Sequence, residues 1–344
     1  MKKGFLAFFM TLFLCACNSV IPASEDIIVP LFSTNSTSQN KIWIGTFQLV
    51  FNDMKNNILG QDIYFEGEKP TYELKGLNSE EFNSSMLNES SYYTSYGETS
   101  PEAKDKIKQD IKQKFNETSD IIDNMDWTRG YGKYYAYAML KKEFEFINEF
   151  DKLDSAKFNN SENKFAYFGI KNGSKEVLRD NLRVLFYNNE DDYAVCLMTK
   201  SGDLVYLYRT EENASLKDLY KKMLHEENNF EGSRQFAKID TLKVPNLKFK
   251  KMREYKELCN KIIRGTDNYF AQAIETVQFE LDNKGGKVKS EAAIMMEATA
   301  IFTPDVQKPR NFNFDKTFAM FLVDSGKDDA YMALRIQRLD DFVK

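Results

Sequence analysis

His225 is the single histidine of this 344-residue chain, so any catalysis that needs an imidazole has one candidate. Ser-His-Asp and Cys-His arrangements and HExxH zinc sites all require histidine as base or ligand. His225 ends an expected helix in KKMLHEENN, a common position for histidine, and we assign it no catalytic role. The pair Gly285-Gly286 lacks the Lys-Ser/Thr and the helix start of a phosphate loop. We therefore expect no enzyme, no metal and no cofactor, although a pair of carboxylates of the glycosidase kind stays open.

The N-terminus carries a second kind of chemistry. Lys2 and Lys3 precede GFLAFFMTLFL, an apolar run too short for a comfortable membrane span. Leu14-Cys15-Ala16-Cys17 resembles a bacterial lipobox, which implies a signal peptide over 1–16 and a lipid on Cys17. The alternative is an ordinary secretory signal that is cut a few residues later. In either case the protein is expected to leave the cytoplasm, and the lipid would hold it in the cell envelope, facing the periplasm or the exterior.

The composition limits the classes of partner that we expect the protein to bind. A formal charge of -5 and a pI near 5.4 argue against nucleic acid or an anionic membrane face as the main partner. The Ser/Thr/Asn-rich run STNSTSQN predicts that 17–40 is a lipid-anchored flexible tether before a domain over 41–344. Cys196 and Cys259 remain after processing, and they either pair or stay free.

Helices come early and strands later, which indicates an α+β domain. The patterns predict helices over 43–58, near SEEFNSSML, and over 101–115, 215–224 and 252–263. Strands are predicted over 133–147, 164–170, 182–188, 192–210 and 241–250, and in two runs near the C-terminus.

The stretch DNKGGKVKSEAAIMMEATA, residues 282–300, alternates like a strand although it follows a Gly-Gly kink. Gly286, Val288, Ser290, Ala292 and Ile294 are small or apolar, and most residues between them are polar. It predicts either an amphipathic strand that is permanently paired in a sheet or a loop with the pattern of a strand.

Three regions, read in order, resemble the serpin family. PEAKDKIKQDIKQKF with YYAYAMLKKEFEF resembles the helix that crosses the main sheet and the central strand. DTLKVPNLKF resembles the Val-x-x-Pro-Lys-Phe strand. ETVQFELDNKGGKVKSEAAIMMEATA with FNFDKTFAMFLVD resembles the strand before the reactive loop, its hinge and the strand beyond it. This resemblance implies a large mixed or antiparallel sheet, N-terminal helices and a second, smaller sheet.

The resemblance also implies a function. A protease inhibitor of this kind exposes a reactive loop, here about 286–310, as bait and inserts it into the main sheet after cleavage. The hinge would comprise Gly285, Gly286, Val288, Ser290 and Ala292, and the scissile bond would join Thr299 and Ala300. The small residues Ala298, Thr299 and Ala300 around this bond imply an elastase-like extracellular or periplasmic protease as the partner. A monomer without nucleic acid, held to the membrane by its lipid, is expected.

Two other function classes stay open. Gly286-Lys287-Val288-Lys289 is bulkier and more charged than the usual serpin hinge, which slows insertion and favours a non-inhibitory surface lipoprotein that acts as a binding or structural module. An extracellular enzyme would need two or three carboxylates that converge in a cleft.

Overall fold

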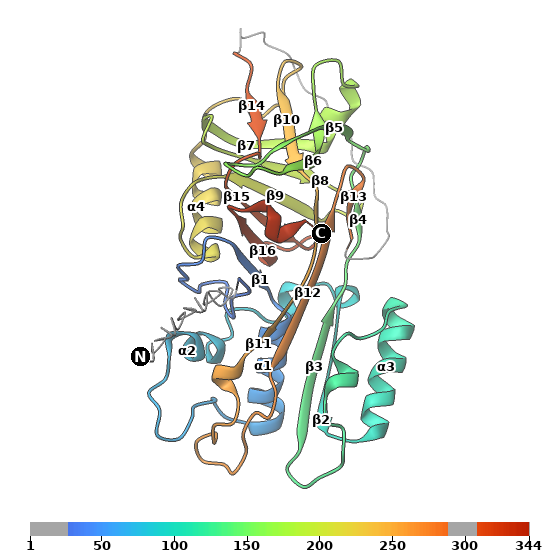
Figure 1. Ribbon diagram of the computed structural model, residues 1–344, viewed down its shortest axis with the longest axis vertical. Coiled ribbons are helices and arrows are strands. Elements are labelled where there is room, and N and C mark those ends of the chain that lie inside the picture. The colour runs from blue at the N-terminus through green and yellow to red at the C-terminus, as the bar shows by residue number, and fades with distance from the viewer. Residues whose placement is uncertain (1–26, 288–307, 344) are drawn as a thin grey trace, which may run out of the picture.

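The computed structural model describes residues 27–287 and 308–343, and it is α+β, as predicted (Figure 1). Its upper part in the figure contains an antiparallel six-stranded sheet in the order β1-β16-β15-β9-β8-β7. These strands are β1 Lys41–Ile44, β7 Leu182–Asn189, β8 Asp192–Met198, β9 Leu204–Arg209, β15 Phe318–Val323 and β16 Ala330–Ile336. Each of the last two is buried at every position, because both faces of this sheet are covered.

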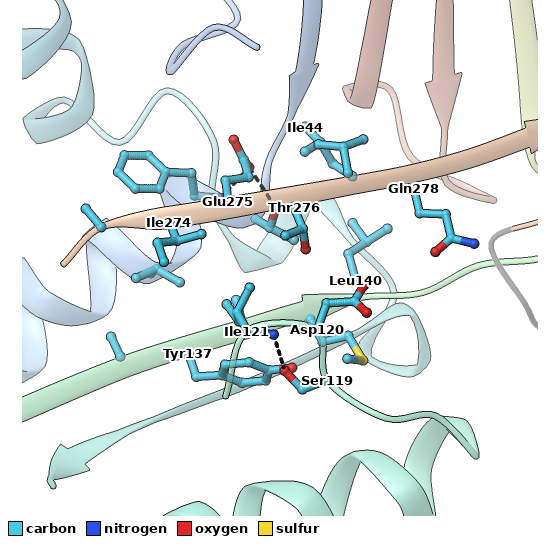
Figure 2. Close-up of a pocket in the computed structure, with 18 of the residues that line it drawn as sticks. Ile44, Ser119, Asp120, Ile121, Tyr137, Leu140, Ile274, Glu275, Thr276 and Gln278 are labelled. Carbon is cyan, nitrogen blue, oxygen red and sulfur yellow. Dashed lines mark hydrogen bonds between the residues drawn. The ribbon is translucent and has the colours of Figure 1, made fainter. Parts of the chain in front are cut away.

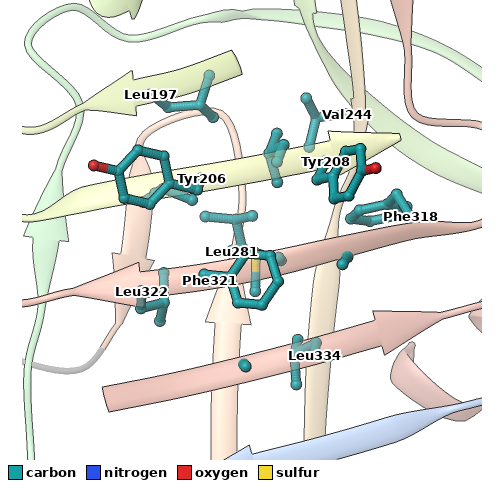
Figure 3. Packing of buried hydrophobic residues seen from close by; sticks show 14 of the residues in the cluster. Leu197, Tyr206, Tyr208, Val244, Leu281, Phe318, Phe321, Leu322 and Leu334 are labelled. Atoms are coloured by element: carbon teal, nitrogen blue, oxygen red, sulfur yellow. The ribbon is translucent and has the colours of Figure 1, made fainter. Parts of the chain in front are cut away.

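A second sheet has the order β14-β10-β6-β5. Its strands are β5 Asp151–Lys157, β6 Lys164–Ile170, β10 Thr241–Pro245 and β14 Asn311–Asn313. Val244 of β10 reaches the same buried cluster as Tyr208 of β9 and Phe321 of β15 (Figure 3). One continuous core therefore joins the two sheets.

The main sheet consists of two separate groups of strands. One group has the order β11-β12-β13-β4, and the other pairs β2 with β3. The strands are β2 Tyr92–Glu98, β3 Tyr134–Leu140, β4 Phe144–Glu145, β11 Leu247–Glu254, β12 Ile274–Leu281 and β13 Gly285–Lys287. β4 follows β3 along the chain, so the two groups of strands meet at the junction of β3 and β4. Below this junction in Figure 1 the groups diverge, on either side of α1 Thr46–Asp53.

Two helices follow their sequence signals closely. α3 spans Pro101–Phe115, and the Ser100 hydroxyl accepts a hydrogen bond from the Ala103 N–H at 3.0 Å at its start. α4 spans Leu216–Asn229 and has the same kind of cap at Ser215. The predicted strands over 164–170, 182–188 and 192–210 are confirmed, the last as two strands joined by a turn.

Other element predictions were wrong. The helix predicted over 252–263 is absent, because β11 continues to Glu254 in unbroken register with β12 and only a 3-10 turn, Lys256–Leu258, follows. Pairing with a neighbour here overrides helix propensity. The first helix begins at Thr46, because Trp43 and Ile44 belong to β1, and it continues as a π-helical segment, Met54–Leu59. Near SEEFNSSML there is only a 3-10 turn, Ser84–Met86, and the second helix is α2 Tyr72–Asn78.

The flexible tether predicted for 17–40 needs correction over its described part, 27–40. Ser38 and Asn40 are buried, and the Asn40 side chain donates to the Arg338 carbonyl at 2.9 Å. The Asn40 side chain packs because it satisfies backbone groups near the C-terminus, and its oxygen also accepts from the N–H groups of Gln337 and Arg338. Cys196 and Cys259 are both free, and burial raises the pKa of the Cys196 thiol to about 12.

Candidate functional site: an open groove in the main sheet

A groove of about 500 Å³ separates β3 from β12 (Figure 2). All seven residues of β3 line it, and so do the first five residues of β12. Within the described part of the chain, β3 pairs with β2 alone. β12 pairs with β11 along its length and with β13 only at Glu280 and Leu281. Two strands thus present unpaired backbone edges to a shared space, which is the arrangement that an additional strand completes.

The floor of the groove is apolar. α1 supplies Phe47, Val50 and Phe51. Alternation along β3 leaves the small side chains Ala136 and Ala138 among the residues that line the space. A strand placed here would therefore bury its inward side chains against a hydrophobic surface with little bulk to displace.

The chain after α3 crosses the outer side of the groove. Ser119 and Ile121 lie beside Tyr137 of β3 (Figure 2). Asp120 forms an ion pair of 2.7 Å with Lys250 of β11, on the far side of β12. Both partners of this pair are about half exposed, so it holds the segment only weakly.

β13 starts at the end of this groove and turns back on β12. Leu281 is the Cα partner of Gly286 on one side, and Phe144 is its partner on the other, both antiparallel. Gly286 is buried and Lys287 is exposed. An added Cβ at Gly286 would lie 2.3 Å from the Phe144 ring, so the residue fits because it has no side chain.

The backbone conformation at position 285 and its close approach to β4 require glycine there. Its φ is +156°, and an added Cβ would lie 2.0 Å from the Phe144 carbonyl oxygen. Gly285→Ala is expected to lower the free energy of unfolding by about 1–3 kcal/mol, because either the strand pair or the turn must shift. Gly173→Ala is the control, since φ there is +88° and nothing lies within 4 Å. Equal urea midpoints for the two variants would show that the close approach to β4 does not matter.

Glu275 is a buried carboxylate at the edge of the groove. Its Oε1 accepts hydrogen bonds from the Thr46 hydroxyl at 2.9 Å and the Phe47 N–H at 3.2 Å. Its Oε2 accepts from the Tyr255 hydroxyl at 2.7 Å. Burial raises the pKa of Glu275 to about 7, although these hydrogen bonds favour the charged form. β12 thereby caps the N-terminus of α1, which has no capping side chain of its own.

A buried ion cluster fixes the junction between β3 and β4. Lys142 contacts both Asp203 and Asp324, which lie in the turns of the six-stranded sheet. Asp324 also accepts from the Asn88 N–H at 2.9 Å and the Ser91 hydroxyl at 2.9 Å. Burial alone would raise the pKa of Asp324, but the hydrogen bonds from Lys142 and Asn88 outweigh it and lower the pKa. Because both carboxylates are closed to solvent and paired, they do not offer the acid and base of a glycosidase.

Of the site residues predicted from the sequence, the structure describes only Gly285 and Gly286. Gly285 and Gly286 are the first two residues of β13. Cys17, Val288, Ser290, Ala292, Thr299 and Ala300 lie outside the described residues. His225 is exposed on α4, where Asn229 is its neighbour.

Two kinds of feature are absent from the described residues. No group of three His, Cys, Asp or Glu residues is placed to hold a metal ion there. No helix in that part of the chain has the length and apolarity to cross a membrane.

Comparison with known proteins gives likenesses of structure only. No protein-family model and no curated protein sequence matches the chain. A structure of thyroxine-binding globulin in complex with thyroxine is 12% identical, with a TM-score of 0.43, and the match covers 69% of this chain and 65% of that one. A structure of Serpin48, described as a highly specific serpin in the insect Tenebrio molitor, is 12% identical, with a TM-score of 0.38, and the match covers 87% of this chain and 75% of that one.

The arrangement of this chain's own elements is serpin-like, as its motifs predicted. α3 packs on β2 and β3 through Ile107, Ile111 and Phe115. β12 leads into Gly285-Gly286, and this pair lies against β4, the continuation of β3. The α+β fold class is thereby confirmed, with several sheets in place of one large sheet and one smaller sheet.

Proposed function

We propose that the protein is a serpin-like protease inhibitor of the cell envelope, lipid-anchored at Cys17, whose chain after Gly285 is the bait. The observation that carries this proposal is the open groove between β3 and β12, with β13 aimed into it. A chain that continued in the direction of β13 would run antiparallel to both strands. It would satisfy the two unpaired edges at once.

The register of β13 supports the pattern in the sequence. Leu281 faces Gly286, and Glu280 faces Lys287. Continued along β12, this register sets Val288 opposite Phe279, Ser290 opposite Val277 and Ala292 opposite Glu275. Phe279, Val277 and Glu275 are, together with Leu281, the buried positions of β12. Small or apolar residues of the bait would thus meet inward positions, and Lys289 and Glu291 would face solvent.

Insertion explains how cleavage becomes inhibition. A serine protease cuts the bait and remains attached to it as an acyl-enzyme. The freed strand enters the groove, which is favourable because it buries apolar surface and completes two ladders. The attached protease is carried along before water releases it. Small residues at Ala298, Thr299 and Ala300 suit a shallow pocket, so an elastase-type enzyme is the proposed target.

The test is an equimolar mixture of the purified protein with an elastase-type serine protease. We expect an SDS-resistant adduct of the protease with the part of the chain that ends at Thr299, because the fragment that begins at Ala300 leaves as the amine product, and a matching loss of protease activity. A clipped protein beside a fully active protease would contradict inhibition and favour the non-inhibitory binding module. The charge of Lys287 in the proposed hinge is the observation that favours this alternative.

A matched pair of variants separates insertion from simple recognition. Ser290→Arg would place a charge at an inward position, where burial without a partner costs several kcal/mol, and is expected to reduce the adduct at least about tenfold while cleavage continues. Ala293→Arg changes an outward position of the same segment and should leave the adduct intact. Equal adduct yields from the two variants would refute the proposed register.

A further inference from the structure

We propose that Glu275 is a pH-sensitive latch beneath the groove: its protonated form keeps β12 on α1, and its ionised form lets the two part. The latch lies wholly within the described residues and does not rest on protease inhibition. Its failure and that of the proposed function can therefore be told apart.

The geometry makes Glu275 the link between an edge of the groove and its floor. One oxygen holds the first turn of α1 through Thr46 and Phe47, and the other meets Tyr255, which is fully buried. Glu275 itself is only 4% exposed. Separation of β12 from α1 must break these hydrogen bonds and admit water to the carboxyl group (Figure 2).

The charges around Glu275 do not neutralise it. Arg253 acts on it from β11, but the Arg253 guanidinium is engaged by the Ile28 carbonyl and by Glu257, at 2.5 Å each. α1 faces it with the uncharged Thr46 and Phe47, and β3 lines the groove opposite with Ala136, Ala138 and Leu140. Burial raises the pKa of Tyr255 well above its usual value, so Tyr255 stays neutral when Glu275 titrates.

The sign of the effect follows from this burial. A carboxyl group whose pKa is raised to about 7 in the fold, from 4.5 when hydrated, holds its proton more tightly in the closed state. Closure is therefore most stable at acidic pH and loses stability as the pH rises from about 4.5 to 7. On protonation Oε2 becomes the donor to the Tyr255 oxygen, while Oε1 keeps its two donors on α1. Above pH 7 a charge is buried that opening would hydrate.

Native-state hydrogen exchange of the full-length protein tests the latch. After correction for the intrinsic exchange rate, the opening equilibrium of amides in β12 and α1 is expected to rise about tenfold from pH 6 to pH 8. Amides of β8, in the six-stranded sheet, should show no such change. Glu275→Gln cannot ionise and should abolish the dependence on pH. Glu257→Gln, which removes a half-exposed charge nearby, should retain it.

A second variant keeps the proposal falsifiable if Glu275→Gln does not fold. Tyr255→Phe removes a donor to the carboxylate, so the midpoint of the pH dependence should move upward. A flat profile in the unmodified protein, or a tenfold rise that persists in Glu275→Gln, would overturn the latch. A midpoint in Tyr255→Phe that stays the same or falls would also overturn it.

Discussion

A single cut between Met296 and Ile301 is expected to raise the melting temperature by about 10 °C or more, because the freed strand adds several backbone hydrogen bonds of about 1 kcal/mol each. The gain arises only if the uncut protein is held above its lowest free energy. Limited proteolysis followed by calorimetry measures it.

Two controls make that measurement specific. The Ser290→Arg protein, cut at the same bond, should gain little, because the inward arginine prevents insertion. The Ala293→Arg protein should gain as much as the unmodified protein. A cut that leaves the melting temperature unchanged would identify a protein already at its energy minimum, which is the alternative of a binding module.

Replacement of Lys142 by alanine is expected to lower the free energy of unfolding by about 3–5 kcal/mol. Lys142 is the shared partner of Asp203 and Asp324, and all three side chains are at most 5% exposed. Its loss would leave two buried carboxylates without their cation. Urea denaturation of the purified variant measures the effect.

Lys200→Ala is the matched control for that change. Lys200 pairs with Glu145 at 2.7 Å, and both side chains are more than half exposed. A pair of this kind contributes at most about 1 kcal/mol. If both variants lost the same small amount, the buried cluster would not be what holds the junction of β3 and β4.

Local signals in the sequence predicted much of the fold. Ser100, Pro101 and the spacing of Ile107, Ile111 and Phe115 fixed α3, because a cap and a single buried stripe are properties of one segment. The helix predicted over 252–263 was wrong, because the structure of this segment depends on pairing with β12. Pairing between distant strands is not visible in a window of ten residues.

The groove itself could not be predicted, because it depends on where two groups of strands diverge. The Gly285-Gly286 pair indicated a kink after the strand, but its pairing with both β12 and β4 was not predicted, and its role as a hinge stays a prediction. One signal for Glu275 was present. In IETVQFEL the positions that alternate inward are Glu275, Val277, Phe279 and Leu281, and a carboxylate among them indicates a buried polar contact. The Lys142 cluster gave no local signal, since its partners lie 61 and 182 residues away.

Hydrogen exchange of β3 and β12, before and after cleavage within 296–301, tests most directly whether the groove takes up a strand of this same chain. We predict that the amides on the facing edges of Tyr134–Leu140 and Ile274–Leu281 become strongly protected once the chain is cut. Unchanged exchange along both edges in the fully cut protein would contradict this account.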